Sequence, residues 1–333
     1  MRLLAIGTLV LMLGWGVNGT ASQADEGQLQ ELPPLPRGIS SFGAAALGEH
    51  IYVFGGHSGR AHHYHRGNVH GELYRLNWRR AGAWEQLRSD VPGQGLALVA
   101  ARGSLYRIGG MQPLNAEGEA TRLQSLRYFA RFDIAASKWE RLPDLPEPRS
   151  SFDATVLGDH IYVFGGWDLG EEGARWHEHG LCFDLARPEQ GWQRVPQPFQ
   201  RRALTVVAYQ EQIYVLGGLT PDKQVSLDVD IYDPQQKRWT KGPSLPGPRS
   251  NGFGCASGVA DGKLYVSLSD GHLYELRGER WQAVGQIKPA RAMHRLVALD
   301  GGSLCFIGGS PRQEGKQDTG EMLRLVQAWR VPR

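Results

Sequence analysis

Arginines recur at one point of a repeated sequence pattern, and a series of guanidinium groups at one level would suit the binding of carboxylates. They stand in the short segments that precede successive copies of this pattern, which we call links. These arginines are Arg37, Arg149, Arg201 with Arg202, Arg249 and Arg291. Because bidentate contacts from arginine to a carboxylate are strong and directional, the series predicts an acidic ligand. The alternative is that each arginine tethers the neighbouring segment through a carbonyl or a carboxylate. The second copy has Gly93-Gln94-Gly95 at this point, which interrupts the series.

Two further segments hold most of the other side chains with chemistry. The first is rich in histidine and contains no acid: His57, His62, His63, His65 and His70. The second is acidic and aromatic and ends in two histidines: Trp167, Asp168, Glu171, Glu172, Arg175, Trp176, His177, Glu178 and His179. If both segments are loops on the face that carries the arginines, all three sets would contribute to one site.

One interpretation of these segments is a metal site. His177 and His179 are two residues apart, so on a strand they would point the same way, and both could be ligands. Asp168 or Glu178 would then supply a further ligand. The histidines at 62, 63 and 65, however, match no known metal-ligand spacing.

Two other interpretations stay open beside the metal. Trp167 and Trp176 would stack on the rings of a sugar, with arginine and histidine as hydrogen-bond donors. The third interpretation is a solvated polar loop without a specific ligand. We expect an acidic or glycan-like ligand, or a protein or peptide partner, with no metal and no other cofactor.

The elements that must position these residues are short strands. An apolar run that mostly ends in Gly-Gly recurs about every fifty residues, and its copies start at residues 51, 105, 161, 213, 264 and 304. The fifth copy, Leu264–Ser269, lacks the glycines. Another short apolar run precedes each copy, as at Phe42–Leu47. The glycines allow the backbone to leave the second strand in a conformation that a Cβ atom disfavours.

Each copy continues with a variable loop and a third strand, which ends in an aromatic residue or Leu followed by Asp or Asn. A tryptophan follows, as in Phe132-Asp133 with Trp139 and Tyr232-Asp233 with Trp239. The acid suits the turn into a fourth strand. The tryptophan would fill the widening wedge between neighbouring sheets.

Four antiparallel strands cannot bury both faces of their sheet alone, but six such sheets packed radially can. The pattern therefore predicts an all-β, six-bladed β-propeller. The Gly-Gly, the aromatic-Asp pair and the spaced tryptophan resemble kelch repeats, and the resemblance covers essentially the whole mature chain. It implies the propeller fold and says little about function.

The chain ends would meet in the last blade. The predicted blades span residues 37–92, 93–148, 149–200, 201–248, 249–290 and 291–333, the last completed by 28–36. The segment 28–36 matches 138–146, with Leu29 in the tryptophan position. A third strand predicted at Glu321–Gln327 leaves only Ala328–Arg333 after it. We therefore expect the N-terminal segment to supply the fourth strand, which protects the exposed edges.

Up-and-down strand order also predicts the location of the loops. The links from strand four to strand one and the loops from strand two to strand three share one face of the disc. These loops are long in the first three copies and minimal in the fifth, at Asp270-Gly271. The long loops should therefore lie on one half of that face.

Enzymatic motifs are scarce in this chain. We find no nucleophile elbow, no phosphate-binding glycine loop and no two-histidine zinc helix. The similarity to galactose-oxidase-type copper propellers is in fold only, because none of Cys182, Cys255 and Cys305 stands in a matching motif. Exported bacterial sialic-acid mutarotases are six-bladed kelch propellers of similar size. Their chemistry needs an acid or base and an arginine for the sugar carboxylate, and Glu171 or Glu172 with Arg175 would be candidates.

The local motif of those mutarotases does not match this chain. A binding or interaction module is therefore the preferred prediction. A mutarotase or epimerase acting on an acidic sugar such as sialic acid is the alternative.

The N-terminus predicts export. Met1-Arg2 precedes an apolar run, Leu3–Val17, and Ser22-Gln23-Ala24 offers a signal-peptidase site. This run is short for a membrane span, so we expect a signal peptide at 1–24 and a periplasmic or extracellular protein without stable membrane insertion after cleavage. An uncleaved anchor is the alternative.

Charge and cysteine usage exclude other classes. A net charge of +3 over 333 residues gives no concentrated basic surface for nucleic acid. Three distant cysteines form no disulfide framework and no zinc spacing. Buried free thiols are the preferred prediction, with a Cys255–Cys305 bridge as the alternative.

Overall fold

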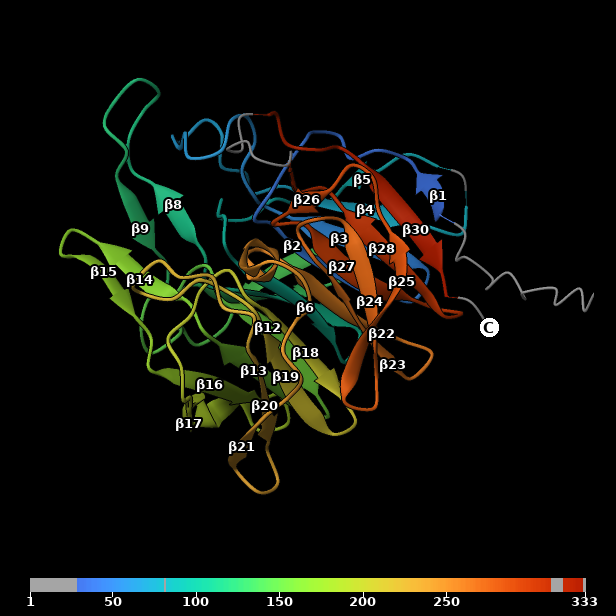
Figure 1. The fold of residues 1–333 in the computed structure, drawn as a ribbon. Helices are drawn as coiled ribbons and strands as arrows, with labels where there is room; N and C mark the ends of the chain where they lie inside the picture. Colours follow the sequence, from blue (N-terminus) through green and yellow to red (C-terminus); the bar gives the residue numbers. More distant parts are fainter. Residues whose placement is uncertain (1–28, 81, 313–319, 332–333) are drawn as a thin grey trace, which may run out of the picture.

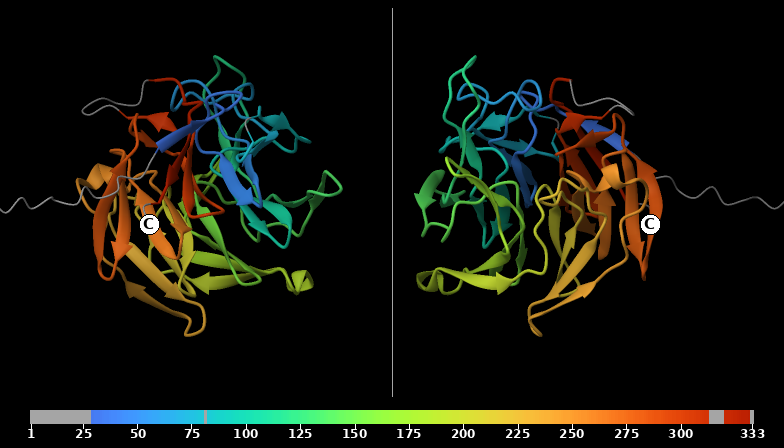
Figure 2. Two further views of the ribbon diagram at one scale, coloured as in Figure 1. Left: turned by 90° about the vertical axis from the view of Figure 1, so that its right-hand side faces the viewer. Right: turned by 60° about the vertical axis from the view of Figure 1, so that its left-hand side comes forward.

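The computed structural model describes residues 29–80, 82–312 and 320–331. Within these residues, six antiparallel sheets of four strands stand around a common axis (Figures 1 and 2). This confirms the predicted all-β, six-bladed propeller. Two short 3-10 helices, Pro188–Gln190 and Arg249–Gly252, lie between strands.

The blades follow the chain. Blade 1 contains β2 (Gly43–Leu47), β3 (His50–Phe54), β4 (Leu73–Asn77) and β5 (Glu85–Gln86). Blade 2 contains β6 (Ala97–Ala101), β7 (Ser104–Ile108), β10 (Phe129–Asp133) and β11 (Lys138–Arg141). Blade 3 contains β12 (Asp153–Leu157), β13 (His160–Phe164), β16 (His179–Asp184) and β17 (Trp192–Pro196).

The second half repeats this order. Blade 4 contains β18 (Thr205–Tyr209), β19 (Gln212–Leu216), β20 (Val229–Asp233) and β21 (Arg238–Lys241). Blade 5 contains β22 (Ala256–Ala260), β23 (Lys263–Ser267), β24 (His272–Arg277) and β25 (Arg280–Gln286). Blade 6 contains β27 (Arg295–Leu299), β28 (Ser303–Ile307), β30 (Val326–Arg330) and β1 (Leu29–Leu32).

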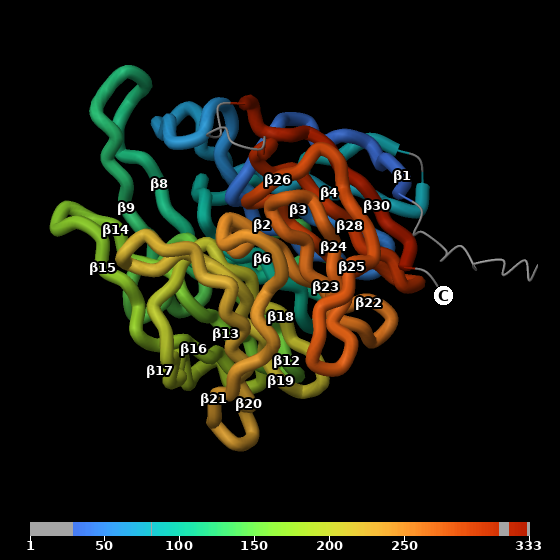
Figure 3. The backbone as a smooth tube through the Cα atoms, viewed as in Figure 1, coloured from blue at the N-terminus to red at the C-terminus, as the bar shows by residue number. Residues whose placement is uncertain are grey.

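The two chain ends meet in blade 6, as expected. Strand β1 pairs antiparallel with β30, with Leu29 opposite Trp329, and the tube in Figure 3 shows the two segments side by side. The predicted third strand at Glu321–Gln327 is wrong, because the strand lies at Val326–Arg330. Trp329 takes the aromatic position of this repeat, opposite Leu304 in β28. The proposed signal segment 1–24 lies outside the described residues.

A closed ring of backbone hydrogen bonds joins all six repeats at the axis. Each link contributes one residue with a positive φ, whose N–H donates to the carbonyl of its counterpart in the preceding repeat, at 2.6–3.3 Å. These ring residues are Ser41, Gly95, Ser151, Ala203, Gly254 and Met293. Four of the six are not glycine, so the closure holds them in a backbone region that side chains disfavour.

Below this ring, a polar network closes the channel between the blades. Arg295 of blade 6 donates to Asp153 of blade 3 at 2.7 Å. The same guanidinium donates to the carbonyls of Phe42 and Leu96, which belong to blades 1 and 2. Asp153 also accepts from the N–H of Val206 in blade 4, at 3.0 Å. One arginine and one aspartate thus connect five blades.

Outer-strand tryptophans fasten each blade to the preceding one. In five repeats, the indole N–H donates to a backbone carbonyl of the blade before: Trp84 to Pro33, Trp139 to Arg88, Trp192 to Pro143, Trp239 to Pro196 and Trp281 to Pro243. In blade 6, Leu29 stands in the tryptophan position and is exposed. The tryptophan therefore bridges neighbouring sheets as well as filling the wedge between them.

All three cysteines are free, with Cys255 and Cys305 buried and Cys182 half-buried, so no Cys255–Cys305 bridge forms. In the described part of the chain, no helix has the length and apolar character of a membrane span.

Links and long loops share one face of the disc. In repeats 1 and 3, an antiparallel bridge pairs a link residue with a loop residue, Ser40 with His57 and Ser150 with Trp167. Two hairpins project from one side of this loop face (Figure 1): β8 (Met111–Pro113) with β9 (Leu123–Ser125), and β14 (Trp167–Gly170) with β15 (Gly173–Trp176). A third pair, β26 (Arg291–Ala292) with β29 (Ser310–Pro311), stays short.

Candidate functional site

A pocket of about 750 Å³ opens on the loop face above the hydrogen-bonded ring. Its floor includes the ring residues Ser41, Ser151 and Met293, so it lies on the propeller axis. Segments from blades 1, 2 and 3 form much of its wall, including both projecting hairpins. We call this cavity the axial pocket.

In four of the six repeats, the residue before the ring residue also lines the axial pocket. Ser40, Gln94, Arg202 and Phe253 occupy this position in four repeats, and all four line the axial pocket. Sequence analysis missed Gln94 and Phe253 as site residues. The aligned links contained the signal, since these positions are equivalent in every repeat.

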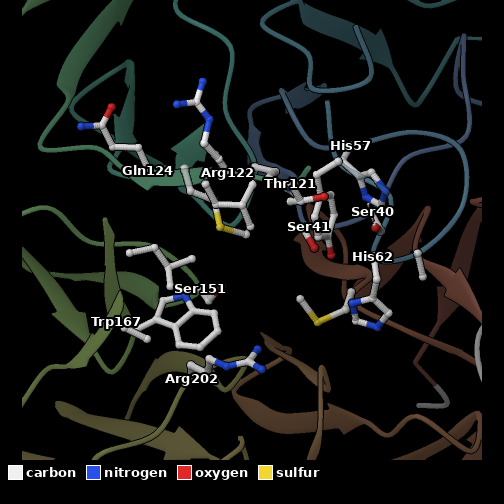
Figure 4. A pocket seen from close by; sticks show the side chains of 18 of the residues that line it. Ser40, Ser41, His57, His62, Thr121, Arg122, Gln124, Ser151, Trp167 and Arg202 are labelled. Carbon is white, nitrogen blue, oxygen red and sulfur yellow. Dashed lines mark hydrogen bonds between the residues drawn. The ribbon is translucent and has the colours of Figure 1, made fainter. Parts of the chain in front are cut away.

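Arg202 is the cation at the base of the pocket. Its guanidinium lies 4.1 Å from the ring centroid of Trp167, and Figure 4 shows the two side chains beside each other. Among the described residues, its side chain has no hydrogen bond or ion pair, and its Nε atom is buried without a partner. Burial lowers the pKa of Arg202 from its ordinary value. Cation–π contact holds the group in place and leaves its N–H donors available.

The opposite wall is also polar. His57 and His62 lie across the pocket from Trp167 (Figure 4). Arg122, which directly precedes β9, also lines the pocket. Arg122 is exposed, and its side chain has no ion pair within the described residues. Glu171, at the tip of the β14–β15 hairpin, is the one carboxylate among the described residues that line the pocket. Two cations against one exposed acid make the axial pocket electropositive.

Three of the six arginines in the predicted series, Arg149, Arg201 and Arg291, are buried inside their own blades and do not line the axial pocket. Arg149 is fully buried and donates to the carbonyls of Gly165 and His179 at 2.9 and 3.0 Å. Arg291 is also fully buried and bonds to Gly308 and Gln327. These two arginines therefore tether strands, which is the alternative that the sequence left open.

The remaining arginines of the series separate into different environments. Arg201 is buried against Asp230, whereas its neighbour Arg202 faces the axial pocket. Arg37 is paired with Glu72 at 3.1 Å. Arg249 is exposed in its 3-10 helix. Neither Arg37 nor Arg249 lines the axial pocket.

In blade 2, a different arginine replaces the missing link residue. Arg107 of β7 is fully buried, and its Nη2 atom lies 2.8 Å from where a Cβ on Gly93 would stand. Its guanidinium lies 4.3 Å from the Tyr128 ring centroid. Burial lowers the pKa of Arg107 to about 10. The link glycine therefore leaves room for an arginine that comes from the second strand.

Some histidines of the histidine-rich loop form hydrogen bonds within the loop, and others line the axial pocket. His57 is buried: its Nε2 lies 3.0 Å from the Arg60 carbonyl and its Nδ1 lies 3.3 Å from Ser40 Oγ. Burial lowers the pKa of His57 to about 4, so the ring is neutral at pH 7. His62 lines the axial pocket, but His63 is exposed and His65 caps its own turn through the Gly67 N–H. His63 and His65 do not line the pocket.

The acidic loop forms the β14–β15 hairpin. Asp168 lies opposite Arg175 in this hairpin, and their side chains pair at 3.4 Å. Burial raises the pKa of Asp168 despite this arginine. Glu172 is exposed at the hairpin turn and does not line the axial pocket. Of the predicted residues here, Trp167 and Glu171 reach the cavity.

His177 and His179 converge on a carboxylate that sequence analysis did not name. Their ligand atoms and a carboxylate oxygen of Glu147 all lie within 4.8 Å of one another. Burial, and next the nearby Arg149, lowers the pKa of both imidazoles, for His177 to about 3. The predicted ligands Asp168 and Glu178 are elsewhere, since Glu178 is exposed and accepts from Gln200 at 2.7 Å.

Comparison with known families matches residues 95–309 to the KLHDC2/KLHL20/DRC7 Kelch-repeats domain. Kelch-like protein 40 of Xenopus tropicalis is 29% identical over 253 residues, which is 73% of this chain and 40% of that protein. Kelch repeat and BTB domain-containing protein 12 of Danio rerio is 30% identical over 213 residues, 59% of this chain and 33% of the relative. The chain thus spans less than half the length of these curated relatives.

Among solved structures, YjhT superposes with a TM-score of 0.67. The match covers 88% of this chain and 96% of that one at 16% sequence identity. At that identity, the likeness concerns the fold.

Proposed function

The chain belongs to the kelch-repeat family of interaction modules, and on that premise we propose that it binds an acidic ligand, such as an acidic sugar, in the axial pocket. The observation that carries the proposal is Arg202. This cation lies half-buried on the Trp167 face, with no ion-pair partner among the described residues. A half-buried cation without an acid is partly desolvated and uncompensated, so a carboxylate from a ligand would offset its desolvation.

The rest of the lining supports a ligand with both polar and ring-shaped parts. Trp167 and Phe253 offer aromatic surface beside Arg202, and Gln94 and Ser151 offer hydrogen-bonding groups at the floor. A pocket with apolar walls and few convergent polar groups is typical of small-ligand sites. An acidic side chain or chain terminus of a peptide could bind Arg202 in the same way.

We expect Arg202→Gln to weaken binding of acidic ligands by roughly 10- to 100-fold, because a charge-assisted hydrogen bond contributes about 1.5–3 kcal/mol. Binding is measured on an array of acidic sugars, neutral sugars and acidic peptides, then by titration calorimetry. Arg202→Lys should retain only part of the affinity, since lysine lacks the planar donor fork. Arg37→Gln is the matched control, because Arg37 is ion-paired outside the axial pocket. Equal binding by folded wild-type and Arg202→Gln protein would rule the pocket out.

A second candidate function is that of a mutarotase or epimerase, and the position of Glu171 supports it. This carboxylate lines the pocket that holds Arg202, so an acid or base and a carboxylate-binding cation share one cavity. The same acidic sugars decide between the two functions. Faster anomeric exchange by NMR that Glu171→Gln abolishes would support the enzyme, whereas binding without exchange supports the module.

We also propose that the chain is exported and loses residues 1–24. The apolar run Leu3–Val17 and the small residues before Asp25 support this. Expression of the full chain in a bacterium should yield a periplasmic protein that begins at Asp25. N-terminal sequencing measures this, and an intact Met1 in a membrane fraction would point to an uncleaved anchor instead.

A further inference from the structure

A second site lies outside the axial pocket, where Glu147, His177 and His179 meet. We call these three residues the His–Glu cluster. Glu147 comes from the link before blade 3, and the histidines stand at the end of the β14–β15 hairpin and the start of β16. None of the three lines the axial pocket.

The hydrogen bonds of His177 indicate that a proton or a cation is needed between its ring and Glu147. Its Nε2 lies 3.0 Å from the Pro148 carbonyl, which can only accept, so Nε2 carries the proton. The other ring nitrogen, Nδ1, lies 3.3 Å from Glu147 Oε2. In a neutral ring, Nδ1 then directs a lone pair at a carboxylate oxygen, which is repulsive. In the opposite tautomer, the lone pair of Nε2 would face the Pro148 carbonyl oxygen instead, which is repulsive as well. Either a proton or a metal ion must lie between these two atoms.

A proton is poorly suited to that place. His177 is 2% exposed, and a charged imidazolium there would be desolvated beside the buried Arg149. His179 adds a second unsatisfied atom, since its Nε2 is buried without a hydrogen-bond partner among the described residues. That Nε2 lies 3.7 Å from the same Glu147 oxygen. Two imidazole nitrogens and one carboxylate oxygen therefore lie within 4.8 Å of one another.

We propose that the His–Glu cluster binds a divalent transition metal ion of the zinc type. Zinc accepts two imidazoles and a carboxylate at about 2.0–2.2 Å, which sets neighbouring ligand atoms roughly 3.3 Å apart in a tetrahedron. The two distances to Glu147 Oε2, 3.3 and 3.7 Å, are near this spacing. Nitrogen ligands disfavour calcium and magnesium. Three protein ligands leave one position open to water or to a further ligand.

Groups around the cluster match what supports metal ligands elsewhere. The Pro148 carbonyl orients His177 by holding its distal N–H. Arg194 donates to the other carboxylate oxygen, Glu147 Oε1, at 2.6 Å and leaves Oε2 for the metal.

Three arginines oppose the ion and limit its affinity. Arg149 is committed to two backbone carbonyls, and Arg194 occupies Glu147 Oε1. Arg175 is largely exposed and lies 3.6 Å from Oε2, but Asp168 offers it another partner at 3.4 Å. Arg175 is therefore the cation that must leave Oε2 when the metal binds. Its removal should strengthen metal binding.

The test is titration of the untagged, metal-free chain with Zn²⁺ by calorimetry, and with Co²⁺ by visible absorption. We expect one ion per chain, a four-coordinate Co²⁺ spectrum, and at least tenfold weaker binding by His179→Gln. The His179 side chain is partly exposed, so its replacement does not leave a cavity in the hydrophobic core. Arg175→Gln should bind Zn²⁺ several-fold more tightly than wild type.

The matched control is His160→Gln, because His160 forms a surface pair with Asp184 at 3.8 Å and should leave Zn²⁺ affinity unchanged. Thermal denaturation establishes that each variant is folded. Unchanged affinity in His179→Gln, weaker binding in Arg175→Gln, or loss of binding only when His63 and His65 are replaced would each overturn the proposal. Because the readout is metal binding, it is independent of any ligand in the axial pocket.

Discussion

Lowering the pH from 7 to 5 is expected to destabilise the protein by roughly 5 kcal/mol, because three buried histidines outside the His–Glu cluster resist protonation. Burial lowers the pKa of His57 and His70 to about 4 and of His294 to about 3. In the unfolded chain these groups titrate near pH 6.5. Between about pH 6.5 and 4 the unfolded state therefore binds more protons, and stability falls as the pH falls.

Each such histidine contributes about 1.4 kcal/mol per pH unit inside this window. For a domain stable by about 5 kcal/mol, the low end of the usual range, this loss places the midpoint of acid unfolding near pH 5. Denaturant unfolding at several pH values measures the slope. His70→Gln should reduce this slope by about 1.4 kcal/mol per pH unit. A free energy of unfolding that stays level from pH 7 to 5 would contradict this account.

Replacing Asp153 with alanine is expected to cost about 2–4 kcal/mol of stability, because it leaves a cation unpaired at the centre of the propeller. Asp153 accepts from Arg295 at 2.7 Å and from the Val206 N–H at 3.0 Å, and its side chain is 9% exposed. Breaking a buried pair costs about 3–5 kcal/mol, and the partial exposure of Arg295 reduces this.

The matched control for this prediction is Asp144→Ala. Asp144 pairs with Arg141 on the surface at 2.5 Å, and such pairs contribute about 0–1 kcal/mol. The midpoint of urea denaturation measures both variants. If Asp153→Ala loses no more stability than Asp144→Ala, the axial network does not hold the blades together. Replacing Asp153 and Arg295 together by apolar residues should recover part of the loss, since no unpaired charge remains.

Local repetition explains why the fold could be predicted. In blades 1 to 5, every strand pairs with a strand of its own repeat, so the fifty-residue period carries the pairing, the Gly-Gly exits and the tryptophan positions. The closing strand β1 was recognisable for the same reason, because 28–36 copies the fourth-strand motif. The error at β30 arose where the sixth repeat departs from the motif, with Trp329 in place of the usual aromatic-Asp pair.

The candidate site was less predictable, because one step along the chain reverses the direction of a side chain. Arg201 and Arg202 are adjacent, yet the first is buried against Asp230 and the second lines the axial pocket. Similarly, Glu147 lies thirty residues before His177 in the sequence but 3.3 Å from it in space. Spacing along the chain carries no information about such contacts between a link and a hairpin.

The amino-acid pattern by itself determined the number of blades, their order and the meeting of the chain ends, since these follow from the sequence motif that the repeats share. It also placed links and long loops on one face. Only the tertiary structure decided which arginines tether strands and which one faces a cavity. It alone showed the hydrogen-bonded ring, the Arg295–Asp153 closure and the His–Glu cluster. The physical reason is that burial and partner choice depend on how six curved sheets converge, and no single repeat contains that information.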